Sequence, residues 1–216
     1  MRAVVVAHGD VLPSDRAAID GDSFVVAADG GAFALERWNI FPHLVVGDMD
    51  SLGQAGVERL ARQGIAVARF PPDKDESDLE LAVAQAIAAG AKEIVVLGAL
   101  GGERLDHEAA NLLLLADPGY DGVHIEARRG ALRVRALRGP GSLTLDGPTG
   151  SRVTLLPVAG DAEGVSTTGL RYRLDAETLR FGRARGLSNE IAALPASVSF
   201  DRGTLLVFES PQGGAT

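Results

Sequence analysis

Uninterrupted apolar runs alternate with helical patterns along the first half of the chain. The candidate strands are Arg2–Ala7, Phe24–Ala28, Leu44–Val46, Ala66–Phe70 and Glu93–Leu97. A parallel strand covered by helices on both faces buries all of its side chains, so such runs are typical of parallel sheets. The pattern therefore predicts an α/β domain built on a doubly wound, mostly parallel sheet.

The clearest helical pattern covers Asp78–Ala89. Its apolar positions follow i, i+3, i+4 spacing: Leu79, Ala82, Val83, Ala86 and Ile87. Ser77 and Glu80 have the spacing of a capping box, and Gly90 stands where a helix C-cap belongs. A further helix is expected over Asp106–Ala116.

After about residue 128 the apolar positions alternate with polar ones, as in Leu132–Arg135 and Ser197–Phe200. Turns rich in Gly and Pro separate these runs, a pattern typical of an antiparallel sandwich or barrel. We therefore expect two domains, an α/β domain over 1–128 and an all-β sandwich domain over 129–216. The segment Val123–Ala127 is compatible with the last strand of the first sheet or the first strand of the second domain.

Composition narrows the class of protein. The 216 residues are 46% hydrophobic and 23% charged, with a net charge of −8 and no cysteine. This acidic balance without a Lys/Arg cluster argues against a nucleic-acid partner, and no apolar stretch approaches the ~18 residues of a membrane span. The first residues lack the pattern of a signal peptide. We expect a cytoplasmic protein that does not contact a membrane.

Three short acidic stretches carry the candidate chemistry: Val46–Ser51, Asp73–Asp78 and Arg104–His107. Carboxylates collected at strand ends repel one another by on the order of 4 kcal/mol per pair at ~4 Å. A hard divalent cation with oxygen ligands, Mg²⁺ carrying a phosphorylated substrate, would remove that repulsion. The stretches therefore indicate an enzyme that uses a nucleotide.

Each stretch also has a simpler explanation. Asp48 and Asp50 would point the same way from an extended backbone and form a ligand site, or they form an ordinary Asx turn. Asp29-Gly30-Gly31 ends another strand in the same way, which favours the ligand site. Helix-start chemistry alone accounts for Asp78. Lys74 is either a phosphate contact or a counter-ion.

The third stretch follows the glycine-rich segment Gly98–Gly102. Backbone N–H groups there would face an anion, and Arg104 would grip a phosphate with two donors. His107 is a candidate base or a helix cap. In the second half, Tyr172, Ser188 and Asn189 suit a flat heteroaromatic ligand, although from these residues alone ordinary strand and turn positions are the better explanation.

In order along the chain, these motifs resemble the thiamine pyrophosphokinases of the bacterial type. The motifs are Asp29–Gly31, Gly47–Ser51, Asp73–Asp78, Arg104–His107, Gly169–Tyr172 and Gly186–Asn189. The resemblance implies an α/β catalytic domain, a β-sandwich and a homodimer with active sites at its interface. It also implies transfer of pyrophosphate from ATP to thiamine, which yields thiamine diphosphate and AMP.

The resemblance also implies roles for single residues. Asp48, Asp50 and Asp78 would hold Mg²⁺, and Asp29 would line the nucleotide side. Asp75 and Lys74 would lie close to the phosphates or thiamine, Arg104 would contact phosphate, and Asp106 would orient Arg104. Tyr172 would stack on thiamine, with Ser188 and Asn189 of the partner subunit in the same pocket. Either Asp75 or Asp78 would accept the alcohol proton.

The chain departs from the family pattern at three positions. Glu103 is an extra residue before Arg104, Met49 replaces a common aromatic residue, and Ser77 replaces threonine. Two rival functions remain. One is a pyrophosphokinase for another alcohol, such as a pterin or a modified pyrimidine, whose catalytic half would look the same. The other is a non-enzymatic sensor of thiamine or a nucleotide that keeps the fold. The complete acidic set argues against a sensor, because binding alone does not need such crowded carboxylates.

Overall fold

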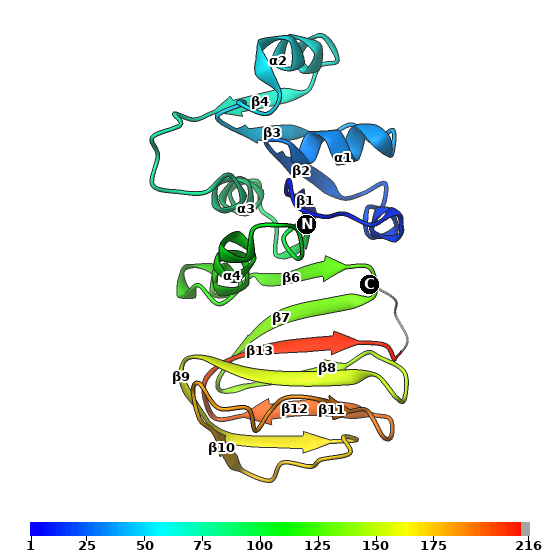
Figure 1. Ribbon diagram of the computed structural model, residues 1–216, viewed down its shortest axis with the longest axis vertical. Helices are drawn as coiled ribbons and strands as arrows, with labels where there is room; N and C mark the ends of the chain where they lie inside the picture. The colour runs from blue at the N-terminus through cyan, green and yellow to red at the C-terminus, as the bar shows by residue number, and fades with distance from the viewer. Residues whose placement is uncertain (213–216) are drawn as a thin grey trace. The chain divides into compact units, whose positions relative to one another are not determined.

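The computed structural model describes residues 1–212, so residues 213–216 of the expected second domain lie outside the described part (Figure 1). The chain forms two compact units. The first comprises Met1–Leu114 and Tyr120–Gly130, and the second comprises Leu115–Gly119 and the chain from Ala131 on. Among the helices of residues 1–212, none is long and apolar enough to cross a membrane.

A parallel sheet forms the centre of the first unit, with the strand order β4-β3-β2-β1-β5-β6. Its strands are β1 (Arg2–Val6), β2 (Phe24–Ala28), β3 (Leu44–Gly47), β4 (Ala66–Arg69), β5 (Glu93–Leu97) and β6 (His124–Arg129). The central strand β1 pairs with β2 on one side and with β5 on the other, where Arg2 is opposite Glu93. All of these strands run in one direction, so their carboxyl ends meet at one edge.

Helices connect these strands, and α1, α2 and α3 pack against the sheet. They are α1 (Gly31–Arg37), α2 (Gly53–Arg62), α3 (Asp78–Ala88) and α4 (Leu105–Leu114), with the 3-10 turns η1 (Pro13–Ala18) and η2 (Pro118–Tyr120). The predicted capping box is present: Glu80 N donates to Ser77 Oγ at 3.2 Å, and Ser77 N donates to Glu80 Oε2 at 2.7 Å. Helix α3 packs on β1, β2 and β3, so the cap fixes its first turn beside the strand ends.

The predicted burial of the strands holds for β1, β2, β3 and β5 and is wrong for β4. Val4, Val26 and Val45 are completely buried. In contrast, the end residues Ala66 and Arg69 of β4 are exposed, because β4 is an edge strand with only β3 beside it. The segment that had two interpretations forms β6, which pairs in parallel with β5 and so belongs to the first sheet.

The second unit is antiparallel, with the order β7-β13-β9-β12-β8, and β10 and β11 also pair with β9. Its strands are β7 (Leu132–Arg138), β8 (Gly141–Leu145), β9 (Arg152–Thr168), β10 (Glu177–Leu179), β11 (Asn189–Glu190), β12 (Ala196–Phe200) and β13 (Arg202–Ser210). The predicted alternation is clear in β12, where Ala196, Val198 and Phe200 are buried. They join a separate core around Leu155, Leu179 and Leu205.

Candidate active site

A cleft of about 760 Å³ lies at the carboxyl ends of the strands of the first unit. Ligands of open α/β sheets bind at this edge. The acidic residues that line the cleft are Asp10, Asp29, Asp50, Asp78, Glu103 and Glu108. Its Lys and Arg lining residues are Lys74 and Arg104. Acidic side chains thus outnumber cationic ones at a place where the fold offers a ligand site.

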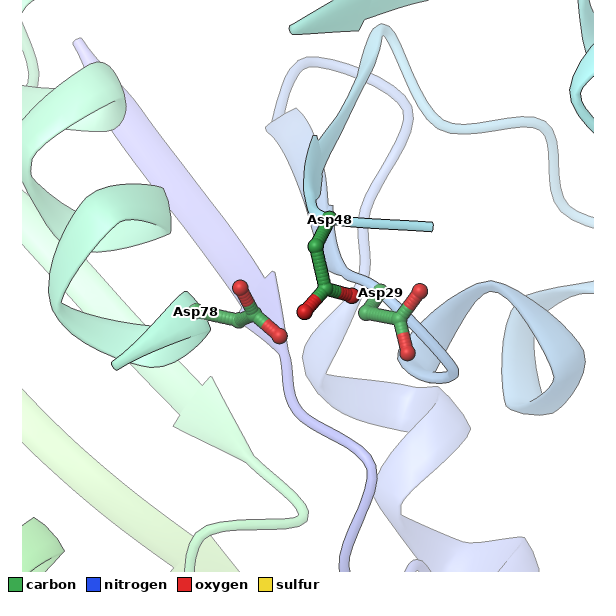
Figure 2. A group of neighbouring side chains, drawn as sticks. All are labelled: Asp29, Asp48 and Asp78. Atoms are coloured by element: carbon green, nitrogen blue, oxygen red, sulfur yellow. The ribbon is translucent and has the colours of Figure 1, made fainter. Parts of the chain in front are cut away.

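Three carboxylates converge at the strand ends: Asp29 follows β2, Asp48 follows β3, and Asp78 begins α3. Asp29 and Asp78 line the cleft, and Asp48 is not among its described lining residues. One oxygen from each of the three carboxylates lies within 4.8 Å of the others, and Figure 2 shows Asp48 between Asp29 and Asp78. Gly47 makes this approach possible. A Cβ at Gly47, whose φ is +148°, would lie 3.0 Å from Asp29 Cβ and 3.1 Å from Asp78 Oδ1.

The carboxylate of Asp29 is buried, with the residue only 4% exposed. Its Oδ1 has no hydrogen-bond partner among residues 1–212. Burial raises the pKa of Asp29, and the charges of Asp50 and Asp78 add to that, while hydrogen bonds from Ser51 and the Gly30 backbone oppose it. Asp29 therefore carries its charge at a cost that a nearby cation would offset.

Lys74 is the cationic side chain within reach of this cluster. Its Nζ lies 2.9 Å from Asp78 Oδ1 and 3.9 Å from Asp48 Oδ2. Burial opposes the lysine charge, but the contact with Asp78 and the fields of Asp48 and Asp29 outweigh it and raise the pKa of Lys74. The sequence left Lys74 as either a phosphate contact or a counter-ion, and in this arrangement it is a counter-ion of Asp78 and Asp48.

The donor set suits a hard divalent cation. All three groups are carboxylates, the ligand type that Mg²⁺ and Ca²⁺ prefer. Asp29 Oδ1 is buried without a hydrogen-bond partner among the described residues, and the buried Asp78 Oδ1 has the Lys74 ammonium 2.9 Å away. Buried oxygens without donors are the groups that a metal ion would satisfy.

The structure brings Asp48 and Asp78 together as the sequence predicts, but the third member of the described cluster is Asp29. Asp50 lines the cleft beside it. The expectation of extended backbone between Asp48 and Asp50 is wrong, because Met49 has a φ of 69°. The alternative Asx turn is present, since Asp50 N donates to Asp48 Oδ1 at 3.0 Å. Turn and carboxylate cluster thus coexist.

The glycine-rich segment after β5 is held by polar contacts from both sides. Gly9 N donates to Gly98 O at 3.0 Å, and Asn111 Nδ2 donates to Ala99 O at 3.0 Å. Gly101 N donates to Glu108 Oε1 at 3.1 Å. These contacts fix the segment along the wall of the cleft.

Arg104 and Asp106 form the predicted pair at the rim. Arg104 Nε and Nη2 donate to the two oxygens of Asp106 at 2.9 and 2.7 Å, and this contact lowers the pKa of Asp106. Both side chains are 66% exposed, so the guanidinium is open to an incoming anion. His107 also lines the cleft. Asp75 is exposed in the loop before α3 and is not among the described lining residues.

In the second unit, Tyr172 is 55% exposed, and the guanidinium of Arg171 lies 5.7 Å from the centre of its ring. Asn189 is buried and holds the Tyr172 backbone. Tyr172 N donates to Asn189 Oδ1 at 3.0 Å, and Asn189 Nδ2 donates to Tyr172 O at 2.7 Å. Ser188 has a φ of 57°, and its N donates to Thr154 Oγ1 at 3.2 Å. The structure thus brings Asn189 and Tyr172 together.

Sequence reasoning missed several polar residues of the cleft. Asp10 lines it after β1, and Glu108 and Asn111 hold the glycine segment from α4. Glu108 and Asn111 are three residues apart on one helical face that begins just after the glycines. Paired polar residues with that spacing are the signal that would have identified them.

Comparison with known proteins adds independent information. Residues 16–127 match the family model of the thiamin pyrophosphokinase catalytic domain, and residues 143–205 match that of the thiamin pyrophosphokinase vitamin B1 binding domain. A thiamine pyrophosphokinase from Bacillus subtilis is 26% identical over 212 residues, which cover 95% of this chain and 97% of that protein.

Solved structures give the same picture of the fold. The Bacillus subtilis thiamine pyrophosphokinase superposes with a TM-score of 0.87 at 24% identity, covering 98% of this chain and 100% of the other. A thiamin pyrophosphokinase from Geobacillus thermodenitrificans superposes with a TM-score of 0.83 at 27% identity, with complete coverage of both chains. The two-part architecture is therefore shared along the whole chain.

Proposed function

Because this chain belongs to the thiamin pyrophosphokinase family, we propose that its acidic cleft binds ATP and transfers the pyrophosphoryl group to thiamine. The products are thiamine diphosphate and AMP. The thiamine hydroxyl oxygen forms a bond to the β-phosphorus, the bond between that phosphorus and the oxygen bridging to the α-phosphate breaks, and the hydroxyl loses its proton. The chain is thus an ATP-dependent thiamine diphosphokinase.

One observation carries this proposal on the structural side: the carboxylates of Asp29, Asp48 and Asp78 lie together at the strand ends, where Asp29 and Asp78 also line the cleft. We assign Mg²⁺ to Asp48, Asp50 and Asp78, with Asp29 on the nucleotide side and close enough to take part. A divalent ion held by these carboxylates would act as a Lewis acid and offset the negative charge that develops on the phosphate groups. The orphaned oxygen of Asp29 supports a cation at this point.

The remaining cleft residues position ATP and move the proton. Asp106 holds the Arg104 guanidinium in orientation through Nε and Nη2, and the N–H groups that this contact leaves free bind a phosphate. Lys74 reaches the phosphates from the loop before α3. The proton acceptor is the carboxylate of Asp75 or Asp78. A carboxylate that holds the metal is a weak base, which favours Asp75. In favour of Asp78, this residue lines the cleft.

For thiamine, we propose a site in the second domain. Tyr172 provides an exposed aromatic face for the pyrimidine or the cationic thiazolium. Asn189 acts through Tyr172, because its side-chain amide is bound to the Tyr172 backbone, and Ser188 lies next to it in the chain. In this proposal residues 1–128 form a doubly wound catalytic domain, and residues 129–216 form a β-sandwich for thiamine binding and dimerisation.

We further propose a homodimer in which the thiamine site of one subunit completes the active site of the other, as the family resemblance implies. Large exposed side chains on the second unit support an interface: Tyr172, Phe181, Leu187 and Leu194. Light scattering of the active enzyme tests this. A fully active monomer at the assay concentration would exclude it. We place the enzyme in the cytoplasm, where ATP is available.

The deciding experiment supplies the purified chain with ATP, Mg²⁺ and thiamine and identifies the nucleotide product. AMP together with thiamine diphosphate is expected. ADP would indicate a simple kinase, and AMP formed without thiamine would indicate that water accepts the pyrophosphoryl group. The Asp48→Asn variant is the matched control, because it keeps the shape of the cluster and loses one charge. Binding of thiamine without any turnover under these conditions would make the chain a sensor instead.

A further inference from the structure

Lys74 contacts two of the three clustered carboxylates. Its Nζ is 2.9 Å from Asp78 Oδ1 and 3.9 Å from Asp48 Oδ2, and its side chain is only 11% exposed. The oxygens of Asp29, Asp48 and Asp78 are all within 4.8 Å of one another. The ammonium group therefore lies against the face of the cluster formed by Asp48 and Asp78.

The lysine balances the charge of the cluster without reaching all of its oxygens. The ammonium lies 2.9 Å from Asp78 Oδ1, whereas the buried Asp29 Oδ1 has no hydrogen-bond partner among the described residues. One ammonium therefore leaves part of the cluster open to another cation.

A metal ion and the ammonium cannot share the position beside Asp78. An Mg²⁺ about 2.1 Å from the same Asp78 oxygen would lie within ~5 Å of Nζ, so two cations would repel each other at close range. Lysine can respond, because its ammonium sits on a flexible four-carbon stem. The other Lys or Arg residue that lines the cleft, Arg104, is paired with Asp106 at the exposed rim.

We infer that Lys74 is a tethered counter-ion that holds the cation position among Asp29, Asp48 and Asp78 and yields it when metal and polyphosphate arrive together. The inference rests on the proposed function, which supplies the polyphosphate. Metal alone must expel Lys74 and leave it without a partner. Metal that arrives with ATP gives the ammonium a phosphate to bind, so the two ligands bind with positive coupling, and each raises the affinity for the other by the same factor.

The test measures metal binding without turnover. Lys74→Met removes the charge and keeps an unbranched chain, and Lys74→Arg keeps the charge. The chain has only two lysines, so Lys92→Met, at an exposed position, is a matched control. Without nucleotide, titration with Mn²⁺ as the probe should give at least tenfold tighter binding for Lys74→Met than for wild type. Lys74→Arg and Lys92→Met should stay within about threefold of wild type.

Stability provides a second readout. In EDTA, Lys74→Met should melt below wild type because its carboxylates lose their counter-ion, and Mg²⁺ should raise its melting temperature more than it raises that of wild type. Equal Mn²⁺ affinity in wild type and Lys74→Met would overturn the inference while leaving the metal site intact. If neither protein binds Mn²⁺, with or without ATP, the proposed metal site itself fails.

Amine labelling of the wild-type protein tests the displacement of Lys74 even if Lys74→Met does not fold. Acetylation of Lys74 and Lys92 is followed by mass spectrometry. Saturating Mg²⁺ alone should increase the labelling of Lys74 relative to Lys92, because the ammonium is displaced. Addition of a non-hydrolysable ATP analogue should protect it again. Unchanged labelling of Lys74 at saturating Mg²⁺ would show that the lysine keeps its position and would refute the exchange.

Discussion

Substitution of Asp29 by asparagine should stabilise the metal-free protein while it impairs the enzyme. Asp29 is buried, and its Oδ1 has no described hydrogen-bond partner. Its neighbours Asp48 and Asp78 carry the same charge. Asparagine has nearly the same shape, removes the charge and adds an amide that can donate to a neighbouring carboxylate.

The expected gain follows from that environment. An unsatisfied buried polar group costs about 1–3 kcal/mol, and more when it is charged. Asp29→Asn should therefore raise the free energy of unfolding by about 1–3 kcal/mol at neutral pH. For a chain of this length each kcal/mol corresponds to about 2–4 °C in Tm. Activity should fall strongly, because a group proposed to face the metal and the nucleotide has lost its charge.

The pH dependence has a definite sign. Because the pKa of Asp29 is raised in the folded protein, the folded state holds the proton at pH values where the unfolded state has lost it. The contribution of Asp29 to stability is therefore lost as pH rises from the unfolded value of about 3.9 through the folded pKa. The stability difference between Asp29→Asn and wild type should widen over that window and then level off.

The assay is chemical denaturation in EDTA and in Mg²⁺. Asp22→Asn is the control, since Asp22 is exposed and the change in net charge is the same. Mg²⁺ should stabilise wild type more than Asp29→Asn. The reasoning is refuted if Asp29→Asn in EDTA is no more stable than Asp22→Asn, because the gain would then not come from the buried cluster.

Three further substitutions have defined outcomes. Gly31→Ala places a Cβ 1.9 Å from Val6 O, whereas a Cβ at Gly21 meets nothing within 4 Å. In thermal melts, Gly31→Ala should lose about 1–3 kcal/mol or more of unfolding free energy, and Gly21→Ala should not. Equal melting temperatures for the two variants would contradict the clash. Asp50→Asn should lower kcat by orders of magnitude at an unchanged Tm, and near-normal turnover at limiting Mg²⁺ would remove Asp50 from the site. Tyr172→Ala should raise the KM for thiamine about three- to thirtyfold, the equivalent of roughly 0.5–2 kcal/mol. Tyr172→Phe should change this KM only slightly. A rise in the KM for ATP instead would place thiamine elsewhere.

Local patterns predicted the elements of the first unit well. The bounds of β2 and β5 agree with their apolar runs, and the capping box at Ser77 places the start of α3. Helix α4 ends at Leu114 rather than at Ala116, and the residues that follow, Leu115–Gly119, group with the second unit. The spacing of apolar residues within a helix does not predict such tertiary contacts. The exposure of β4 was missed for the same reason, since an apolar run does not reveal which strand is the edge.

The site depended on strand order, which the sequence does not contain. The motif around Asp48 indicated carboxylates at a strand end, but only the adjacency of β2 and β3 brings Asp29 beside Asp48. The left-handed backbone of Met49 decided the position of Asp50, and a methionine gives no hint of a positive φ. Lys74 had two interpretations from sequence because its role depends on distances to Asp48 and Asp78.

The place of β1 in the sheet has a consequence for synthesis of the chain. Arg2 of β1 is opposite Glu93 of β5, so one edge of this buried strand has no partner until some 90 residues later. At about 5–20 residues per second, a ribosome needs roughly 5–18 s to make that stretch. During this time the growing chain carries an apolar strand with an open edge, which can pair with other chains. Early binding of a chaperone to the first residues would therefore protect the yield of folded enzyme.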